Sequence, residues 1–134
     1  MVQYVLDTNI CIYIAKQQPP EVLEKFSSLR VGSLAMSLVT HGELLYGAYR
    51  SQNSEKAHTI LDELVSMISV IPIGKAVAQH YAEIRADLTS KGLLIGNNDL
   101  WIAAHVRSLD KILVTNNTKE FERVQGLNIE NWCA

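Results

Sequence analysis

The sequence has few cysteines and no long apolar run. Cys11 and Cys133 form no CxxC pair and no Cys/His ligand spacing, so neither a zinc site nor a disulfide framework is expected. The longest apolar stretches, such as residues 10–15, are well short of the roughly 20 residues that a bilayer crossing needs. The N-terminus also lacks the basic segment and apolar run of a secretory signal. We therefore expect no membrane span and a cytoplasmic location.

An excess of charge of one sign is also absent. The chain has 12 Lys and Arg residues against 14 Asp and Glu residues, a formal net charge of -2. A protein that binds nucleic acid mainly through bulk attraction to phosphates usually carries a clear positive excess. If nucleic acid is the ligand, local basic residues or a metal ion must supply the positive field.

Several common catalytic motifs are missing. No GxGxxG or GxxxxGK[ST] is present, which disfavours a nucleotide-binding fold. The four histidines form no HxH or HExxH pair, so surface or packing roles are expected for His41, His58, His80 and His105.

The composition that is present fits a globular core. With 134 residues, 48% of them hydrophobic and 19% charged, the chain has the size of one compact soluble domain. No repeat, low-complexity tract or linker divides it, so a single domain over residues 1–134 is expected.

Strand-like and helix-like segments alternate along the chain. Apolar and β-branched residues predict strands at 2–7, 33–37, 69–73, 111–115 and 128–132. Helical spacing predicts helices at about 8–18, 20–29, 40–50, 54–67, 76–91 and 99–109. Thr8 and Asn98 are the expected caps of the first and last of these helices. The alternation predicts an α/β sandwich with a mostly parallel sheet, in which ligands bind beyond the carboxyl ends of the strands.

Three acidic residues occupy positions where a charge is costly. Asp7 directly follows a buried strand, Asp99 precedes the apolar run LWIAA, and Glu43 lies in the amphipathic segment HGELLYGA. Ionised side chains near a core are unfavourable unless they are paired or bind a cation. Mg²⁺ prefers such oxygen ligands and can activate a water molecule for attack on a phosphodiester. Singly, each acid also fits a helix cap or a solvated helix position, and spacing alone does not establish that the three converge.

Four ordered segments resemble the PIN-domain endoribonucleases, specifically the VapC-type toxins of bacterial toxin–antitoxin pairs. They are LDTNICIYI (6–14), MSLVTHGELLYGA (36–48), IGNNDLWIAAH (95–105) and LVTNNTKEFERVQGLNIENW (113–132). The resemblance implies a PIN-like three-layer α/β/α sandwich forming a single PIN domain over residues 1–134. It also implies a Mg²⁺-dependent endoribonuclease, with Mn²⁺ as a substitute, that hydrolyses RNA phosphodiester bonds.

The resemblance also assigns roles to residues of this sequence. It implies that Asp7, Glu43 and Asp99 are the catalytic acids and metal ligands, with Thr8 and Asn9 steadying the first turn. The residues expected to contact substrate or to support the acids are Thr8, Asn9, Ser37, Asn98, Thr115, Asn116, Asn117 and Glu120. Ser37 and Thr115 are expected to hydrogen-bond to the carboxylates. Some relatives carry an aspartate where this chain has Thr115 to Asn117, and Glu120 is the nearest acid here. A single tightly held ion is therefore expected, with a second only when substrate phosphate contributes ligands.

The partners implied by the resemblance are a protein and an RNA. A VapB-type antitoxin is expected to insert its C-terminal segment into the acidic groove of a homodimer, giving a toxin–antitoxin hetero-oligomer. The RNA is expected to be a tRNA, in particular the anticodon region of initiator tRNA. Local basic residues would have to bind the phosphates of this RNA, such as Lys16, Arg50, Lys91 or Lys119.

Two other classes of function share part of this pattern. A phosphoacceptor signalling domain would need an adjacent acidic pair early and a lysine after a late strand, whereas this chain has Asp7 alone and Asn116 after LVT. A non-catalytic binding module remains open, because a carboxylate-lined groove attracts arginine as readily as magnesium. Sensitivity of RNA cleavage to a chelator separates that module from a nuclease.

Overall fold

The computed structural model describes residues 1–133, which fold around one central sheet. Its strands are β1 (Tyr4–Leu6), β2 (Leu34–Ser37), β3 (Ser69–Ile71), β4 (Ile112–Val114) and β5 (Asn128–Glu130). The helices are α1 (Thr8–Lys16), α2 (Pro20–Ser28), α3 (Leu38–Arg50), α4 (Ser54–Met67), α5 (Ala76–Ser90), α6 (Asn97–Leu109) and α7 (Thr118–Phe121), with a short 3-10 helix at Val31–Ser33.

All five strands pair in parallel, in the order β3-β2-β1-β4-β5. The central strand β1 pairs on one side with β2, through Tyr4 opposite Leu34, and on the other side with β4, through Leu6 opposite Val114. Parallel pairing brings the carboxyl ends of the strands to one edge of the sheet. Residues directly after β1, β2 and β4 therefore meet at that edge, although they are distant in sequence.

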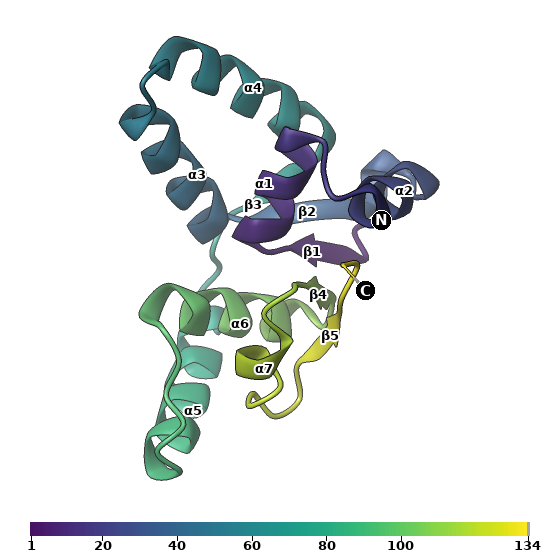
Figure 1. Ribbon diagram of the computed structural model, residues 1–134. Coiled ribbons are helices and arrows are strands. Elements are labelled where there is room, and N and C mark those ends of the chain that lie inside the picture. Colours follow the sequence, from purple (N-terminus) through teal and green to yellow (C-terminus); the bar gives the residue numbers. More distant parts are fainter. Residues whose placement is uncertain (134) are drawn as a thin grey trace.

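Helices cover both faces of the sheet. Helices α1 to α4 lie on one side and α5 to α7 on the other (Figure 1). Because side chains alternate along a strand, Val5 enters the core beneath α5 and α6, whereas its neighbour Leu6 enters the core beneath α1 and α4. Leu113 and Val114 on β4 divide between the two cores in the same way. This is the three-layer α/β/α sandwich that the sequence predicts, with a sheet that is entirely parallel.

Several element boundaries differ from the sequence-based expectation. α3 begins at Leu38 rather than near residue 40, because Ser37 accepts a hydrogen bond from the Val39 N–H and caps the helix. α6 begins at Asn97 after Gly96, so the prediction that Asn98 caps it was wrong. The single turn of α7 was not predicted, because one turn is too short to show a helical period.

The cysteines and the lengths of the helices were also subjects of sequence-based expectations. Cys11 and Cys133 are free thiols, and Cys11 is fully buried, which raises the pKa of its thiol group. Among residues 1–133, no helix combines the length and apolar character that a membrane crossing requires.

Candidate active site

Asp7 stands at the carboxyl end of β1 and is the N-cap of α1. Its Oδ1 accepts a hydrogen bond of 3.0 Å from the Ile10 N–H, and its Oδ2 accepts one from the Thr115 hydroxyl. The side chain is only 5% exposed. The prediction that Thr8 caps this helix was wrong: Thr8 is the first helical residue, which leaves its hydroxyl available for another contact.

Thr115 follows β4, the strand beside β1, and is fully buried. While its hydroxyl donates to Asp7, the same oxygen accepts a hydrogen bond of 2.9 Å from the Asn117 N–H. The predicted hydrogen bond from Thr115 to a carboxylate is therefore present. It joins residues 108 positions apart and fixes the Asp7 carboxylate against the turn after β4.

Glu43 reaches the same edge of the sheet from α3. Its Oε1 accepts a hydrogen bond of 2.6 Å from the Thr8 hydroxyl, which also lies 3.3 Å from the hydroxyl of Thr40. Glu43 is half-buried, and Thr40 is fully buried. The start of α1 thus fixes two acids: Asp7 caps the helix, and the Thr8 hydroxyl orients Glu43.

Asp99 lies in the first turn of α6, as predicted, and Glu120 approaches it from α7. Burial and, after it, the neighbouring carboxyl group of Glu120 raise the pKa of Asp99. Glu120 also accepts a hydrogen bond of 3.0 Å from the Asn117 amide. Asn117 and Glu120 therefore form a hydrogen-bonded pair beside Asp99.

These side chains surround one small cavity of about 180 Å³. Its lining residues are Asp7, Thr8, Asn9, Glu43, Asp99 and Asn117. A wider hollow of about 400 Å³ shares Glu43 and Asp99 with it and is completed by Gly96, Asn97 and Asn98. The three acids predicted from sequence are thus brought to one place, with an open approach beside them.

The electrostatics of the cavity disfavour several simultaneous negative charges. Burial is the largest of the effects that raise the pKa of Asp99 to about 6, and the neighbouring Glu120, Glu43 and Asp7 supply the rest of the increase. Burial also raises the pKa of Asp7, an effect that the hydrogen bonds from Thr115 and the first turn of α1 partly offset. A bound cation would relieve this repulsion.

The donors around the cavity suit a hard divalent cation. They are carboxylate, hydroxyl and amide oxygens, which Mg²⁺ and Mn²⁺ accept, whereas neither histidine nor cysteine lines the cavity. Within residues 1–133, no three Asp, Glu, His or Cys side chains converge closely enough to form a preassembled metal cage. Mg²⁺ commonly keeps several water molecules and uses few protein ligands, so an open carboxylate cavity of this kind fits it.

Two of the predicted supporting residues, Ser37 and Asn116, line neither the small acidic cavity nor the wider hollow beside it. Ser37 was expected to hydrogen-bond to a carboxylate, but it bonds to His105 instead, at 2.7 Å. The Asn116 amide donates to the Tyr13 hydroxyl at 2.7 Å and does not line the acidic cavity. Asn98 is exposed at the wider hollow, and Asn9 borders the small cavity from α1. The contact between Ser37 and His105 was missed because histidine spacing in the sequence gave no reason to join them.

Comparison with known proteins gives consistent matches over the whole fold. A family model described as "PIN domain" matches residues 4–127. The chain is 46% identical over 132 residues to a protein of Shigella flexneri named "tRNA(fMet)-specific endonuclease VapC", covering 98% of this chain and 99% of that protein. It is 42% identical, with the same coverage, to "Ribonuclease VapC2" of Haemophilus influenzae.

Solved structures agree with these sequence matches. The crystal structure of DNA-bound VapBC from Salmonella typhimurium superimposes with a TM-score of 0.93 at 38% identity, over 99% of this chain and 100% of that chain. The DNA-bound VapBC2 structure from Rickettsia felis gives a TM-score of 0.91 at 38% identity, over 98% and 99% of the two chains.

Proposed function

The chain belongs to the PIN-domain family and, within it, to the VapC ribonucleases, and we propose that it cuts RNA with a divalent cation bound between Asp7, Glu43 and Asp99. Ribonucleases of this family depend on divalent metal ions. Mg²⁺ is the proposed ion, with Mn²⁺ as a substitute. The observation that carries the proposal is the shared cavity of these acids, in which the pKa of Asp99 is raised to about 6.

When bound, the ion lowers the pKa of a coordinated water and offsets negative charge on the phosphodiester. The protein's own groups do the positioning. Thr115 and the Ile10 N–H hold the two oxygens of Asp7, and the Thr8 hydroxyl holds Glu43. Each carboxylate therefore keeps one orientation before substrate arrives, which lowers the cost of organising the site during reaction.

Asn117 and Glu120 are proposed to complete the site on the side of Asp99. Glu120 is held by the Asn117 amide and lies beside the Asp99 carboxyl group. A second carboxyl group beside Asp99 favours cation binding there. Asn117 lines the small cavity itself, so its amide would be available to hydrogen-bond to a substrate phosphate there.

The proposed substrate is a tRNA, specifically the anticodon region of initiator tRNA. The Shigella flexneri relative is named as specific for tRNA(fMet). We further propose that residues 1–134 act as one domain in the cytoplasm, where this RNA is found. Sequencing of RNA ends after brief induction of the chain in cells tests the substrate: new ends within the initiator tRNA anticodon loop support it, and ends confined to other RNAs contradict it.

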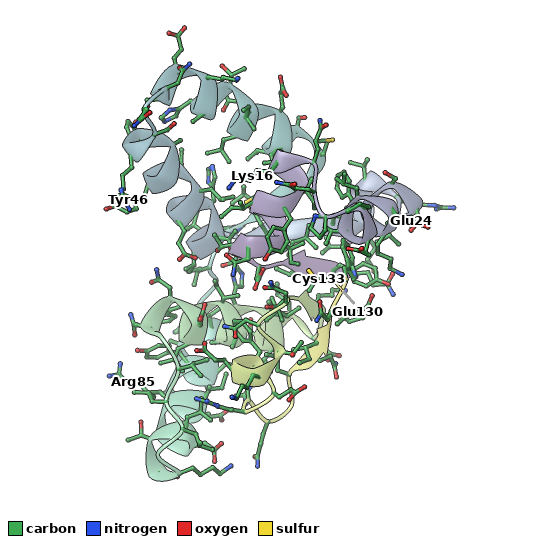
Figure 2. The ribbon with its side chains drawn as sticks, viewed as in Figure 1. Lys16, Glu24, Tyr46, Arg85, Glu130 and Cys133 are labelled. Carbon is green, nitrogen blue, oxygen red and sulfur yellow. The ribbon has the colours of Figure 1, made fainter. Side chains whose placement is uncertain are left out.

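The proposed protein partner is a VapB-type antitoxin, since the similar solved structures are VapBC complexes. A groove of about 360 Å³ runs between α1, α3 and α4 and is lined largely by apolar side chains such as Leu44, Ile60 and Leu64. Lys16, labelled in Figure 2, and Glu43 border it, so the groove reaches the acidic cavity. We propose that the antitoxin's C-terminal segment occupies this groove on each protomer of a homodimer.

Cleavage of a labelled tRNA by the purified chain tests the reaction. We expect cleavage with Mg²⁺ or Mn²⁺, none with a chelator, and a 5′-phosphate on the downstream product. Asp7→Asn and Asp99→Asn are expected to abolish cleavage while the fold is retained, because each removes charge with little change in volume. Asp62→Asn, which removes an exposed carboxylate on α4, is the matched control. Chelator-resistant cleavage, or a 2′,3′-cyclic phosphate, would contradict the water-attack mechanism, and tight RNA binding without cleavage would favour a binding module.

A further inference from the structure

A buried hydrogen bond connects the two helices that carry Glu43 and Asp99. Ser37, the N-cap of α3, and His105, in the middle of α6, are each 1% exposed. Their Oγ and Nδ1 atoms lie 2.7 Å apart, although the residues are 68 positions apart in sequence. Helices α3 and α6 also contact each other directly. The bond is therefore a fixed point between the two helices, shielded from water.

The surrounding hydrogen bonds leave the Ser37 hydroxyl able to pair with the ring. The Ser37 oxygen accepts a hydrogen bond of 3.1 Å from the Val39 N–H and keeps its proton and a second lone pair for His105 Nδ1, so the tautomer of the ring decides which atom donates. A neutral imidazole makes this bond in either tautomer. Burial lowers the pKa of His105, which favours that neutral form. Ser37 thus caps the start of α3 and contacts α6 with the same hydroxyl group.

The bond lies equally far along the chain from both acids. Glu43 is six positions after Ser37 on α3, and Asp99 is six positions before His105 on α6. At about 1.5 Å per residue, each acid lies roughly 9 Å along its helix from the bond. A slide or rotation of either helix at Ser37 and His105 would move the acids relative to each other.

A purely apolar contact would not supply this constraint. Burying an imidazole and a hydroxyl is costly unless they pair, and a hydrogen bond has a narrower range of permitted distances and angles than a packing contact. His105 Nε2 is also buried and makes no close hydrogen bond among the described residues, although the Pro72 backbone lies near enough to the ring to offset part of the lowering of its pKa by burial.

We infer that His105 is a positioning residue of the nuclease: its hydrogen bond to Ser37 sets the relative placement of α3 and α6, and thereby the affinity of Glu43 and Asp99 for the divalent cation. This inference rests on the proposed function, because it concerns the same three acids. It assigns no contact between His105 and the substrate or the ion.

Manganese binding measured by calorimetry or by the shift in melting temperature tests this role without relying on activity. His105→Leu replaces the imidazole with an apolar side chain of similar size that cannot hydrogen-bond to Ser37. We expect its Mn²⁺ dissociation constant to rise about tenfold, the low end of the effect of losing an outer-sphere partner of a metal site. His105→Asn retains a polar group near the position of Nδ1 and should recover most of the affinity.

Two further variants separate positioning from general destabilisation. Ser37→Ala removes the other partner of the hydrogen bond and tests the inference even if His105→Leu does not fold. The variant that carries both substitutions should bind Mn²⁺ no more weakly than the single variant with the lower affinity, because both changes remove the same bond. Leu88→Ala, a fully buried position on α5, is the control that lowers stability without changing Mn²⁺ affinity. The inference is overturned if His105→Leu or Ser37→Ala binds Mn²⁺ as the wild type does, or if Leu88→Ala weakens binding equally. Failure of the wild type to bind Mn²⁺ or cleave RNA would instead overturn the proposed function.

Discussion

The Thr8 hydroxyl and the Glu43 carboxylate are joined by a hydrogen bond of 2.6 Å that links α1 to α3 across the acidic cavity. The two residues are 35 positions apart, yet Thr8 directly follows Asp7, the acid at the end of β1. One dipeptide therefore contributes one acid and orients another. The first turn of α1 therefore links the position of Asp7 to that of Glu43 through the Thr8 hydroxyl.

The first prediction concerns this bond. Thr8→Val keeps the shape of the side chain but removes the donor, so Glu43 loses its fixed orientation. We expect the rate of tRNA cleavage to fall about tenfold, as is typical when a partner of a metal-binding carboxylate is removed. Thr59→Val removes a hydroxyl from the exposed face of α4 and should leave the rate unchanged. An unchanged rate for Thr8→Val would show that Glu43 needs no such support.

The second prediction concerns stability and pH in the absence of divalent ions. The pKa of Asp99 is about 6 in the folded chain, against 3.8 for an ordinary aspartate. Between these values the folded state binds more protons than the unfolded state, so the free energy of unfolding falls as pH rises from about 4 through about 6. Asp7 acts in the same direction, because its pKa is also raised.

Melting temperatures measured in a chelator over this pH range check the sign. Asp99→Asn should flatten the decline, because it removes the group with the raised pKa. Asp62→Asn, on the exposed face of α4, should leave the decline as it is. A wild-type melting temperature that increases steadily from pH 4 to pH 6 would contradict the crowding of acids in the cavity.

The third prediction concerns binding of the ion itself. The folded chain gathers the acids in one cavity, where they repel one another, and the unfolded chain does not. A divalent cation is therefore expected to bind the folded state and not the unfolded state. A concentration of 100 times the dissociation constant adds about 2.7 kcal/mol to the free energy of unfolding. For a chain of this size, that corresponds to a rise in melting temperature of roughly 10 °C. Titration with Mn²⁺ measures the rise, which Asp7→Asn should largely abolish; an equal rise in both proteins would place the ion elsewhere.

The fourth prediction concerns the short helix α7. Phe121 is 1% exposed and packs into the core beneath α5 and α6, where it anchors the turn that carries Glu120. Phe121→Ala should lower the free energy of unfolding by about 3–5 kcal/mol, through lost burial and the cavity left behind. Urea denaturation measures this loss. Glu122→Ala, an exposed neighbour, should change stability by less than about 0.5 kcal/mol.

Much of the fold could be predicted from local patterns, because its elements alternate and its strands are buried. The period of apolar residues located α4 and α5 closely, and the carboxylate after VQYVL marked the end of β1. The starts of α3 and α6 were less accurate. In both cases the helix begins two residues before the expected start, after the caps Ser37 and Gly96, and local spacing does not decide between such neighbouring positions.

The supporting contacts of the site were harder to predict, because they join residues far apart in sequence. Thr115 and Ser37 are both hydroxyl residues that end a strand, and both were expected to bond to a carboxylate. Only Thr115 does so, although the central strand β1 places Asp7 beside the ends of both β2 and β4. Ser37 caps α3 and faces His105 on α6 instead. Which partner each hydroxyl meets depends on the side of the sheet toward which it points after its strand ends, and residue spacing alone does not specify that.

The central place of β1 also governs when the nuclease can first become active during its own synthesis. Asp7 is synthesised before the strand and the threonine that hold it in place, which lie at 112–115, and the hydrogen bond between Asp7 and Thr115 spans 108 positions. A nascent chain in which residues 112–115 have not yet left the ribosome lacks this strand within its sheet and has an incomplete acidic cavity. Because a domain of this kind folds as a unit, the cavity forms only after that strand is available.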